Sequence, residues 1–215
     1  MPRISSDEAI ERIPSDDPVV AGTAPGAVAR KGRGAVSNLA HRFESVQRSS
    51  EPALTDDEEV LPPLATTVTF ETARSIITRN ESPDIGFDRS INPYRGCEHG
   101  CIYCYARPTH SYLNLSPGLD FETKLVAKRN AAELLLKELA APGYAPGLIM
   151  VGVNTDAYQP IERELKITRA ILEVLAATRH PFGLVTKSSL VERDLDLIAE
   201  MARLNLASVS VSITS

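Results

Sequence analysis

The chain has 215 residues, of which 43% are hydrophobic and 24% are charged, and its net charge is −5 at neutral pH. This length and composition are typical of one globular domain with room for a tail. There is no apolar run of about 18 residues and no apolar stretch near the start, so we expect neither a transmembrane helix nor a secretory signal peptide. The negative charge excludes a protein that wraps nucleic acid over its whole surface, but it leaves room for a local basic groove.

The first 60 residues differ in composition from the rest of the chain. They carry 7 Lys and Arg against 11 Asp and Glu, and prolines and glycines interrupt them without a sustained apolar period. Such a segment is typical of chain that does not fold on its own. We therefore expect a disordered acidic tail over residues 1–60 and a folded region over residues 61–215. The basic run at residues 30–33 suits a phosphate contact, but a solvated tail is the favoured interpretation.

Strands and helices are expected to alternate along the folded region. Segments rich in β-branched and apolar residues predict strands at residues 66–70, 90–92, 147–153, 182–186 and 207–213. Residues 125–126 suit either a strand or a turn. Helical periodicity predicts helices from residue 130 to a stop at residues 142–143, and at residues 162–177 and 191–204. Asn130 and Glu133 have the spacing of a capping box.

This alternation predicts an α/β fold with crossover helices and about four parallel strands. No helix follows the last predicted strand to cover its face or edge, so we expect the sequence to stop inside its domain. In that strand Ser208, Ser210 and Ser212 alternate with apolar residues. A hydroxyl-lined face indicates a polar ligand, and a partly hydrated edge strand is the alternative.

All three cysteines lie within eight residues, at Cys97, Cys101 and Cys104, with the spacing C-x3-C-x2-C. Thiols this close favour a shared metal centre, because a disulfide would leave one thiol over. A structural zinc ion needs a fourth ligand, and His99 is cramped inside the first spacer. Three thiolates on a four-iron cluster leave one iron open to a non-protein ligand. The spacing therefore favours an iron–sulfur centre over zinc or incidental thiols, placed after a strand where active sites of barrel-like sheets gather.

The run around the cysteines, residues 92–107, reads NPYRGCEHGCIYCYAR, with Tyr103 directly before the last cysteine. It resembles the cluster loop of the radical SAM superfamily. Together with residues 108–122 it resembles a bacterial subgroup related to spore photoproduct lyase, and the resemblance covers about residues 30–215. It implies a partial (β/α) barrel in which Cys97, Cys101 and Cys104 hold a 4Fe-4S cluster. The open iron would bind S-adenosylmethionine (SAM), with Tyr103 among the cofactor-binding residues.

The resemblance also implies the chemistry. One electron from the reduced cluster would cleave the C5′–sulfur bond of SAM, and the resulting 5′-deoxyadenosyl radical would take hydrogen from an unidentified substrate. A flavodoxin or ferredoxin is the implied electron donor, and the cytoplasm, where thiols stay reduced, is the implied location. The lyase uses a further cysteine as hydrogen donor. That role is missing here or passes to a residue such as Tyr158, so DNA repair is not implied and a nucleic-acid substrate has no support.

Other SAM contacts are inferred from their position in the implied fold. Thr155 and Asp156 follow the second strand, where the superfamily binds the SAM amino group. The usual glycine motif is missing there, and an Asx turn with a helix cap is equally compatible. Lys187 follows the third strand and suits the SAM carboxylate, with a solvated lysine as the alternative. Ser210 and Ser212 suit the ribose or the carboxylate.

Two other functions remain open at this point. The cysteine loop suits a non-catalytic iron–sulfur or zinc module with a structural or sensing role. The chain also suits an inactive fragment of a radical SAM enzyme, because an incomplete barrel would not keep water away from a radical. The sequence patterns indicate neither the substrate nor the oligomeric state.

Overall fold

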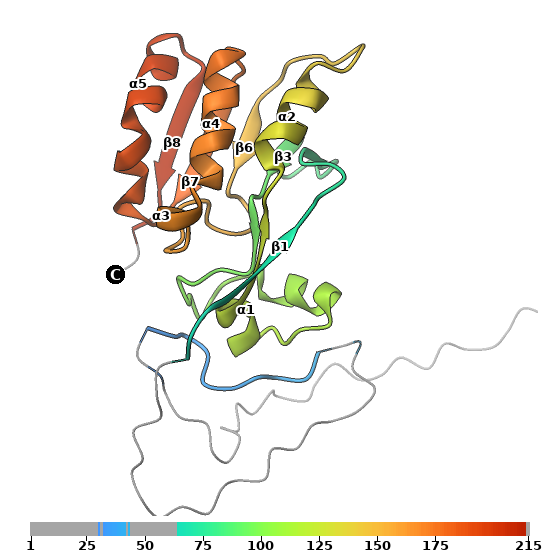
Figure 1. The fold of residues 1–215 in the computed structure, drawn as a ribbon, viewed down its shortest axis with the longest axis vertical. Coiled ribbons are helices and arrows are strands. Elements are labelled where there is room, and N and C mark those ends of the chain that lie inside the picture. Colours follow the sequence, from blue (N-terminus) through green and yellow to red (C-terminus); the bar gives the residue numbers. More distant parts are fainter. Residues whose placement is uncertain (1–29, 31, 42, 44–63, 214–215) are drawn as a thin grey trace, which may run out of the picture.

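The computed structural model describes residues 30, 32–41, 43 and 64–213, which form a mixed α/β fold with two sheets (Figure 1). The strands are β1 (Thr67–Glu71), β2 (Thr78–Arg79), β3 (Arg89–Ile91), β4 (Tyr94–Arg95), β5 (Lys124–Lys128), β6 (Ile149–Val151), β7 (Phe182–Thr186) and β8 (Ala207–Val211). The α-helices are α1 (Leu119–Thr123), α2 (Ala131–Leu139), α3 (Glu162–Leu165), α4 (Ile167–Ala177) and α5 (Leu195–Arg203), and the 3-10 helices are η1 (Arg107–Leu113) and η2 (Ser189–Asp194).

The larger sheet contains the parallel series. Its strand order is β2-β3-β6-β7-β8, in which β3, β6, β7 and β8 run parallel and β2 is antiparallel to β3. Helix α4 connects β6 to β7, and α5 connects β7 to β8. The predicted parallel strands with crossover helices are therefore confirmed, while closure of the sheet into a barrel stays a prediction.

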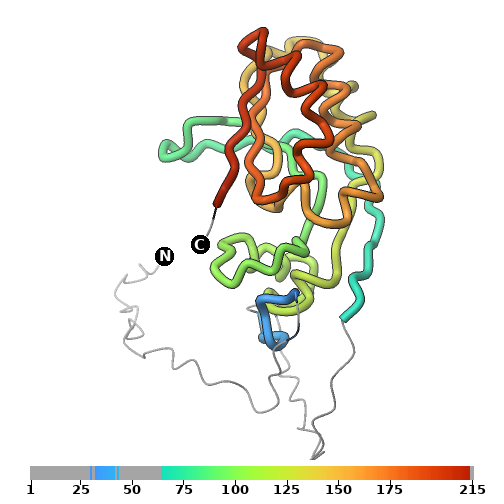
Figure 2. Tube along the Cα trace, turned by 90° about the vertical axis from the view of Figure 1, so that its left-hand side faces the viewer, coloured from blue at the N-terminus to red at the C-terminus, as the bar shows by residue number. Residues whose placement is uncertain are grey.

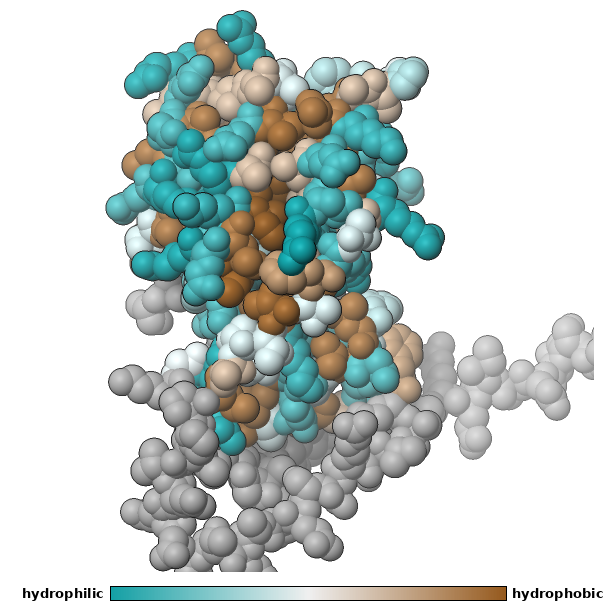
Figure 3. Space-filling model, in the orientation of Figure 1, coloured by the Kyte–Doolittle hydropathy of each residue, from teal (hydrophilic) through white to brown (hydrophobic). Residues whose placement is uncertain are grey.

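The helices α2, α4 and α5 lie on the same face of this sheet (Figures 1 and 2). The core between them is built from alternate strand residues and from one apolar stripe on each helix. Its members include Ile149, Val151, Phe182 and Leu184 from the strands and Leu135, Ile171, Leu172, Leu175, Ile198 and Met201 from the helices. Burial of each such side chain stabilises the fold by about 1.5–3 kcal/mol. In the view of Figure 3, apolar side chains gather between the polar outer surfaces of α4 and α2.

The face of the larger sheet that lies opposite the helices carries small and hydroxyl-bearing residues beside Met150. The strand register places Ser90, Met150, Gly183 and Ser208 in one row, and Ser210 follows two residues after Ser208 on β8. Gly183 leaves room for the Met150 side chain, because a Cβ there would overlap Met150 Sδ. Within the described residues no helix covers this face (Figure 2). The hydroxyl-bearing face predicted for the last strand therefore points away from the helices, and Ser210 is exposed.

The smaller sheet has the order β1-β5-β4 and lies next to the cysteine loop. β1 pairs in parallel with β5, and β4 pairs antiparallel with β5. The strand predicted at residues 66–70 thus forms, but it stands outside the larger sheet, so β3 opens the parallel series. Residues 125–126, which suited a strand or a turn, are strand.

The helix predicted at residues 162–177 is interrupted at Lys166, whose φ of 52° lies in the left-handed region. The cause is a buried carboxylate at the start of the segment. Glu162 Oε2 accepts a hydrogen bond from the N–H of Thr168 at 3.0 Å, and Oε1 accepts one from the N–H of Arg169 at 3.3 Å. Glu162 thereby caps α4 from the preceding short helix α3, which a continuous helix would not allow.

Two smaller expectations about helix starts are corrected. The capping box at Asn130 does not form, because the Asn130 amide instead bonds both the N–H and the carbonyl of Ala73, each at 3.0 Å. The helix predicted at residues 191–204 begins as the 3-10 turn η2 and becomes α-helical only at Leu195.

Most of the predicted acidic tail lies outside the described residues. In the part that is described, Arg33 of the basic run donates hydrogen bonds to Glu122 O at 2.7 Å and to Thr66 Oγ1 at 2.8 Å. None of the helices in the described part of the chain is long and apolar enough to cross a membrane.

Candidate metal and cofactor site

The carboxyl ends of the parallel strands form the edge at which the candidate site lies. Since parallel strands end on the same side of a sheet, the loops after β3, β6 and β7 meet there. Asn92 Oδ1, after β3, accepts a hydrogen bond from the N–H of Asn154, after β6, at 2.8 Å. Asp156 Oδ2 in turn accepts one from the N–H of Lys187, after β7, at 2.8 Å. These hydrogen bonds fix the three loops relative to one another.

The cysteine loop, residues 97–104, is attached to this edge through its backbone. The N–H of Cys97 donates to Phe121 O at 2.9 Å. The buried amide of Gln159 accepts from the N–H of Glu98 at 3.0 Å and donates to Gly96 O at 3.1 Å. A side chain from the loop after β6 therefore holds the start of the cysteine loop from both sides.

The three thiols are free, but their surroundings differ. Cys97 is 7% exposed, while Cys101 and Cys104 are partly exposed. Burial raises the pKa of the Cys97 thiol to about 12, although the N–H groups of His99 and Asp156 face its sulfur and work in the opposite direction. Cys97 is thus a neutral thiol, and the two N–H groups that face its sulfur favour the thiolate form.

The donor set at the cysteine loop suits one kind of metal centre better than another. Among the described residues, no three Cys, His, Asp or Glu side chains lie close enough to hold one metal ion. In a 4Fe-4S cluster, by contrast, each thiolate binds a separate iron, so the three sulfurs need not converge on one ion. His99, the fourth ligand that zinc would need, has Nε2 3.3 Å from Asp156 Oδ2. Three thiols without a fourth donor fit an iron–sulfur cluster better than a four-coordinate zinc ion.

Asp156 is the centre of the strand-end connections. Its Oδ1 accepts from the N–H of Tyr158 at 2.9 Å and from Thr186 Oγ1 at 2.6 Å. Burial alone would raise the pKa of Asp156, but His99 and the hydrogen bonds from Thr186 and Lys187 outweigh it, so the pKa lies below its usual value. The carboxylate is therefore ionised and engaged by protein groups, which is the Asx-turn arrangement.

The other residues assigned to SAM are placed as follows. Thr155 is buried, and its hydroxyl donates to Tyr94 O at 2.8 Å. Lys187 and Tyr103 come together at the edge, with Lys187 Nζ 5.7 Å from the centroid of the Tyr103 ring. Tyr103 is 61% exposed, so its ring is accessible. The structure thus brings together two of the residues assigned to SAM, Tyr103 on the cysteine loop and Lys187 after β7.

Ser210, in β8, and Ser212, just after it, lie near the same edge. The N–H of Ser212 donates a hydrogen bond to Thr186 O at 2.9 Å. Because Thr186 directly precedes Lys187, this bond brings Ser212 next to the segment that carries Lys187. Ser210 lies on the helix-free face and pairs in register with Val185. Figure 2 shows the carboxyl end of β8 directed toward the green segments that contain the cysteine loop.

Sequence reasoning missed two polar residues that support the loop. Gln159 and the carboxylate of Glu122 are completely buried, and both bond the loop or its neighbours. Arg107, directly after the loop, also supports it by donating to Cys101 O at 3.0 and 2.9 Å. No spacing rule marks Gln159, because its partners Glu98 and Gly96 lie 61 and 63 residues away in sequence.

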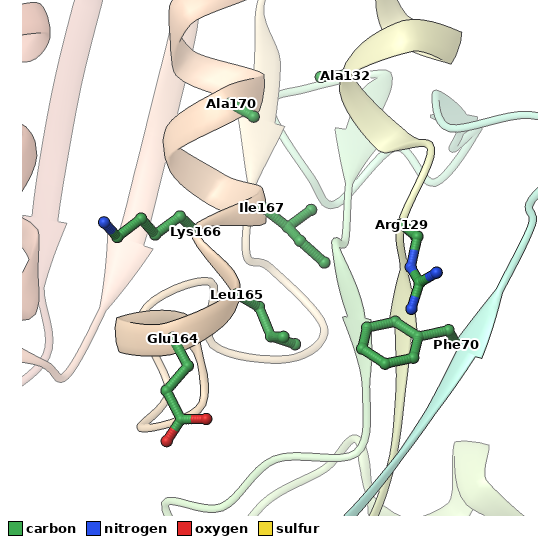
Figure 4. A pocket seen from close by; sticks show the side chains of 8 residues that line it. All are labelled: Phe70, Arg129, Ala132, Glu164, Leu165, Lys166, Ile167 and Ala170. Carbon is green, nitrogen blue, oxygen red and sulfur yellow. The ribbon is translucent and has the colours of Figure 1, made fainter.

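A separate groove lies away from the cysteine loop, between α3–α4 and the ends of β1 and β5 (Figure 4). Its volume is about 350 Å³. Leu165 and Ile167 point into it from one side, and Phe70 and Arg129 form the other side, with the guanidinium 4.0 Å from the ring centroid. None of the predicted site residues lines it.

The fold and the site define an α/β domain in which three free thiols come from one loop at the carboxyl edge of a parallel sheet. Residues 91–215 match the family model described as the Radical SAM superfamily. The match includes the cysteine loop and the larger sheet from Ile91 onward, and the chain therefore belongs to this superfamily. Membership implies, in general terms, a 4Fe-4S cluster and SAM, and it suggests an enzyme.

The chain is also similar to proteins from bacteria and an archaeon. Uncharacterized proteins of Mycobacterium tuberculosis and Mycobacterium bovis are 41% identical over 149 residues, which is 68% of this chain and 44% of each relative. An uncharacterized protein of Methanocaldococcus jannaschii is 34% identical over 116 residues, which is 54% of this chain and 41% of the relative. The chain thus spans less than half the length of these relatives. No solved structure matches it.

Proposed function

We propose that the protein is a radical SAM enzyme in which Cys97, Cys101 and Cys104 hold a 4Fe-4S cluster. The observation that carries the proposal is the set of three free thiols on one loop, attached to the carboxyl edge of a parallel sheet in a chain of this superfamily. When bound, the reduced cluster supplies the electron that cleaves SAM to a 5′-deoxyadenosyl radical. The protein's part is to present the thiols, to shelter the cluster and to orient SAM.

SAM is proposed to lie along the edge beside the cysteine loop. The Lys187 ammonium would pair with its carboxylate, and the exposed ring of Tyr103 would pack against it; their closeness supports this. Ser210 and Ser212 would offer hydroxyls from the last strand.

Thr155 and Asp156, which were predicted to accept from the SAM ammonium, keep their place beside the cofactor in this proposal. Their side chains already bond to Tyr94, Thr186 and Lys187, so they also support the edge.

We further propose membership of the subgroup related to spore photoproduct lyase, supported by the run at residues 92–122. The substrate stays open. Tyr158 is a poor candidate for a hydrogen donor to a product radical, because it is completely buried and its hydroxyl donates to Asp194 Oδ2 at 3.0 Å. A flavodoxin or ferredoxin is the proposed electron donor, and the cytoplasm is the proposed location, because an iron–sulfur ligand set needs reduced thiols.

Reductive cleavage of SAM tests the proposal. The chain, purified and loaded with iron and sulfide under anaerobic conditions, is incubated with SAM and dithionite, and 5′-deoxyadenosine is measured. We expect 5′-deoxyadenosine from the wild type and from the surface control Glu164→Gln, and none from Cys104→Ala. An iron–sulfur protein that leaves SAM intact would instead indicate a non-catalytic module, and a protein that holds one zinc ion and no iron would exclude the cluster.

A further inference from the structure

Residues 33–39, here called the strap, run from the cysteine loop, which Gly34 contacts, to α1, although they precede the region that matches the superfamily. The strap is the blue segment beneath the green loops in Figures 1 and 2. Its composition led us to expect a tail, yet it makes long-range hydrogen bonds at both of its ends. These bonds lead through Glu122 and Arg107 to one of the three cysteines, Cys101.

The strap is joined to the domain through the completely buried carboxylate of Glu122. Glu122 Oε2 accepts from the N–H of Gly34 at 3.0 Å, and Oε1 accepts from the N–H of Ala35 at 2.9 Å. The same carboxylate pairs with the guanidinium of Arg107. A buried carboxylate requires such partners, and here the strap and Arg107 together supply them.

Arg107 links the Glu122 carboxylate to the cysteine loop. Its Nε and Nη2 donate to Cys101 O at 3.0 and 2.9 Å, while Nη2 also pairs with Glu122. The guanidinium is planar, so fixing it on the carboxylate also fixes the direction of its bonds to the carbonyl. A continuous path of charge-assisted hydrogen bonds therefore runs from the strap to the backbone of the middle cysteine.

The strap also touches the residues on either side of Cys101. A Cβ at Gly34 would overlap Gly100 O and would lie 3.0 Å from Ile102 Cγ2. Only glycine permits this approach of the two backbones. The contact places the strap directly against the segment that carries the thiol.

A second attachment holds the far end of the strap. Asn38 and Asp120 bond reciprocally, with Asn38 Nδ2 donating to Asp120 Oδ1 at 2.9 Å and the N–H of Asp120 donating to Asn38 Oδ1 at 2.8 Å. Ser116 Oγ donates to Leu39 O at 2.7 Å. With both ends held, the strap cannot lift from the loop without breaking several hydrogen bonds at once.

We propose that the strap is a positioning element of the metal centre, which fixes Cys101 through Glu122 and Arg107 from outside the superfamily domain. The proposal rests on the proposed function in that Cys101 is taken as a cluster ligand. The hold of the strap on the loop does not itself require the cluster, so the two can be tested separately. Glu122 and Arg107 act through the loop and are positioning residues.

The first experiment measures the alkylation rate of each cysteine in the cluster-free, folded chain, by iodoacetamide treatment and peptide mass spectrometry. The variant is Gly34→Val, and the matched control is Gly86→Val, because a Cβ at Gly86 meets no atom within 4 Å. Freeing the loop should raise the rate at Cys101 about tenfold, since the rate follows the population of the open form. Cys97, on the buried side, should change less, and the control should change none of the rates.

A second variant guards against a folding defect at Gly34. Glu122→Gln keeps the size of the side chain but weakens its bonds to the strap and to Arg107, and it should also raise the rate at Cys101 selectively. Circular dichroism reports whether each variant is folded. An unchanged Cys101 rate in both folded variants, or an equal rise at all three cysteines, overturns the proposal.

A third measurement addresses the metal centre. In the reconstituted protein, the rate of iron release to a chelator should rise about tenfold in Gly34→Val and stay unchanged in Gly86→Val. Faster alkylation without faster iron release would show that the strap holds the loop but not the metal centre, which contradicts the proposal. If the chain binds no cluster at all, the proposed function fails while the alkylation result still decides whether the strap holds the loop.

Discussion

Glu162 is the centre of a buried polar network that joins β4 to α4, and its removal should destabilise the fold strongly. The side chain is completely buried. Its Oε2 accepts from the Tyr94 hydroxyl and from the N–H of Thr168, and its Oε1 accepts from Arg193 Nη2 at 2.7 Å. Tyr94 lies three residues before Cys97, so the network also supports the start of the loop.

The magnitude follows from what each substitution leaves behind. Glu162→Ala leaves the Tyr94 hydroxyl and the N–H of Thr168 without their acceptor, at about 1–3 kcal/mol for each buried donor, while Arg193 keeps its ion pair with Asp194. Glu162→Gln keeps an acceptor but loses the charge, which costs about 1–3 kcal/mol. Because domains of this size are stable by about 5–15 kcal/mol, the alanine variant should lose a large share of its free energy of unfolding.

Urea denaturation of the cluster-free chain, followed by circular dichroism, measures these differences. The control is Glu164→Ala, an exposed neighbour on the same short helix, which should stay within about 0.5 kcal/mol of the wild type. If Glu162→Ala loses less than about 1 kcal/mol of its free energy of unfolding, or no more than the control, the network around Glu162 does not stabilise the fold.

Three further predictions concern the edge and the sheet. Lys187→Ala should weaken SAM binding to the reconstituted protein roughly fivefold in equilibrium dialysis, because a partly exposed ion pair contributes about 1 kcal/mol; unchanged affinity would remove Lys187 from the SAM site. Gly183→Ala should cost about 1–3 kcal/mol by crowding Met150, and the cost should shrink in the double variant with Met150→Ala; equal costs in both backgrounds would refute this. Burial lowers the pKa of His180 below its ordinary value of 6.5, so the folded state binds the proton more weakly than the unfolded state. Its contribution is complete above pH 6.5 and is lost as the pH falls through the lower folded-state pKa, so His180→Gln should flatten the acid side of the stability–pH profile, and an unaltered profile would contradict this.

Much of the larger sheet could be predicted because its signals are local. The apolar runs that form β6 and β7 are continuous, and the helices between the strands carry clear apolar stripes. Parallel order then brings the loops after the strands to one edge, where Lys187 was expected, whereas Tyr103 was assigned through the cysteine motif; the two lie 5.7 Å apart, from Nζ to ring centroid.

The remaining features depend on contacts that no local pattern encodes. The break at Lys166 arises from the way Glu162 caps α4, which a regular helical period conceals. The strap has the glycine and serine content of a tail, and its partner Glu122 lies 88 residues from Gly34. In both cases a buried carboxylate accepts hydrogen bonds from two backbone N–H groups. The periodicity of apolar residues along the sequence does not predict such hydrogen bonds.

The central claim is that the three cysteines together hold one iron–sulfur cluster. The most direct test is the iron and sulfide content of the anaerobically reconstituted chain, compared among Cys97→Ser, Cys101→Ser, Cys104→Ser and the control His99→Ala. The account predicts about four irons and four sulfides per chain in the wild type and in His99→Ala, and loss of the cluster in each serine variant. Iron content that is independent of the cysteines, or a zinc ion that is lost in His99→Ala, would contradict it.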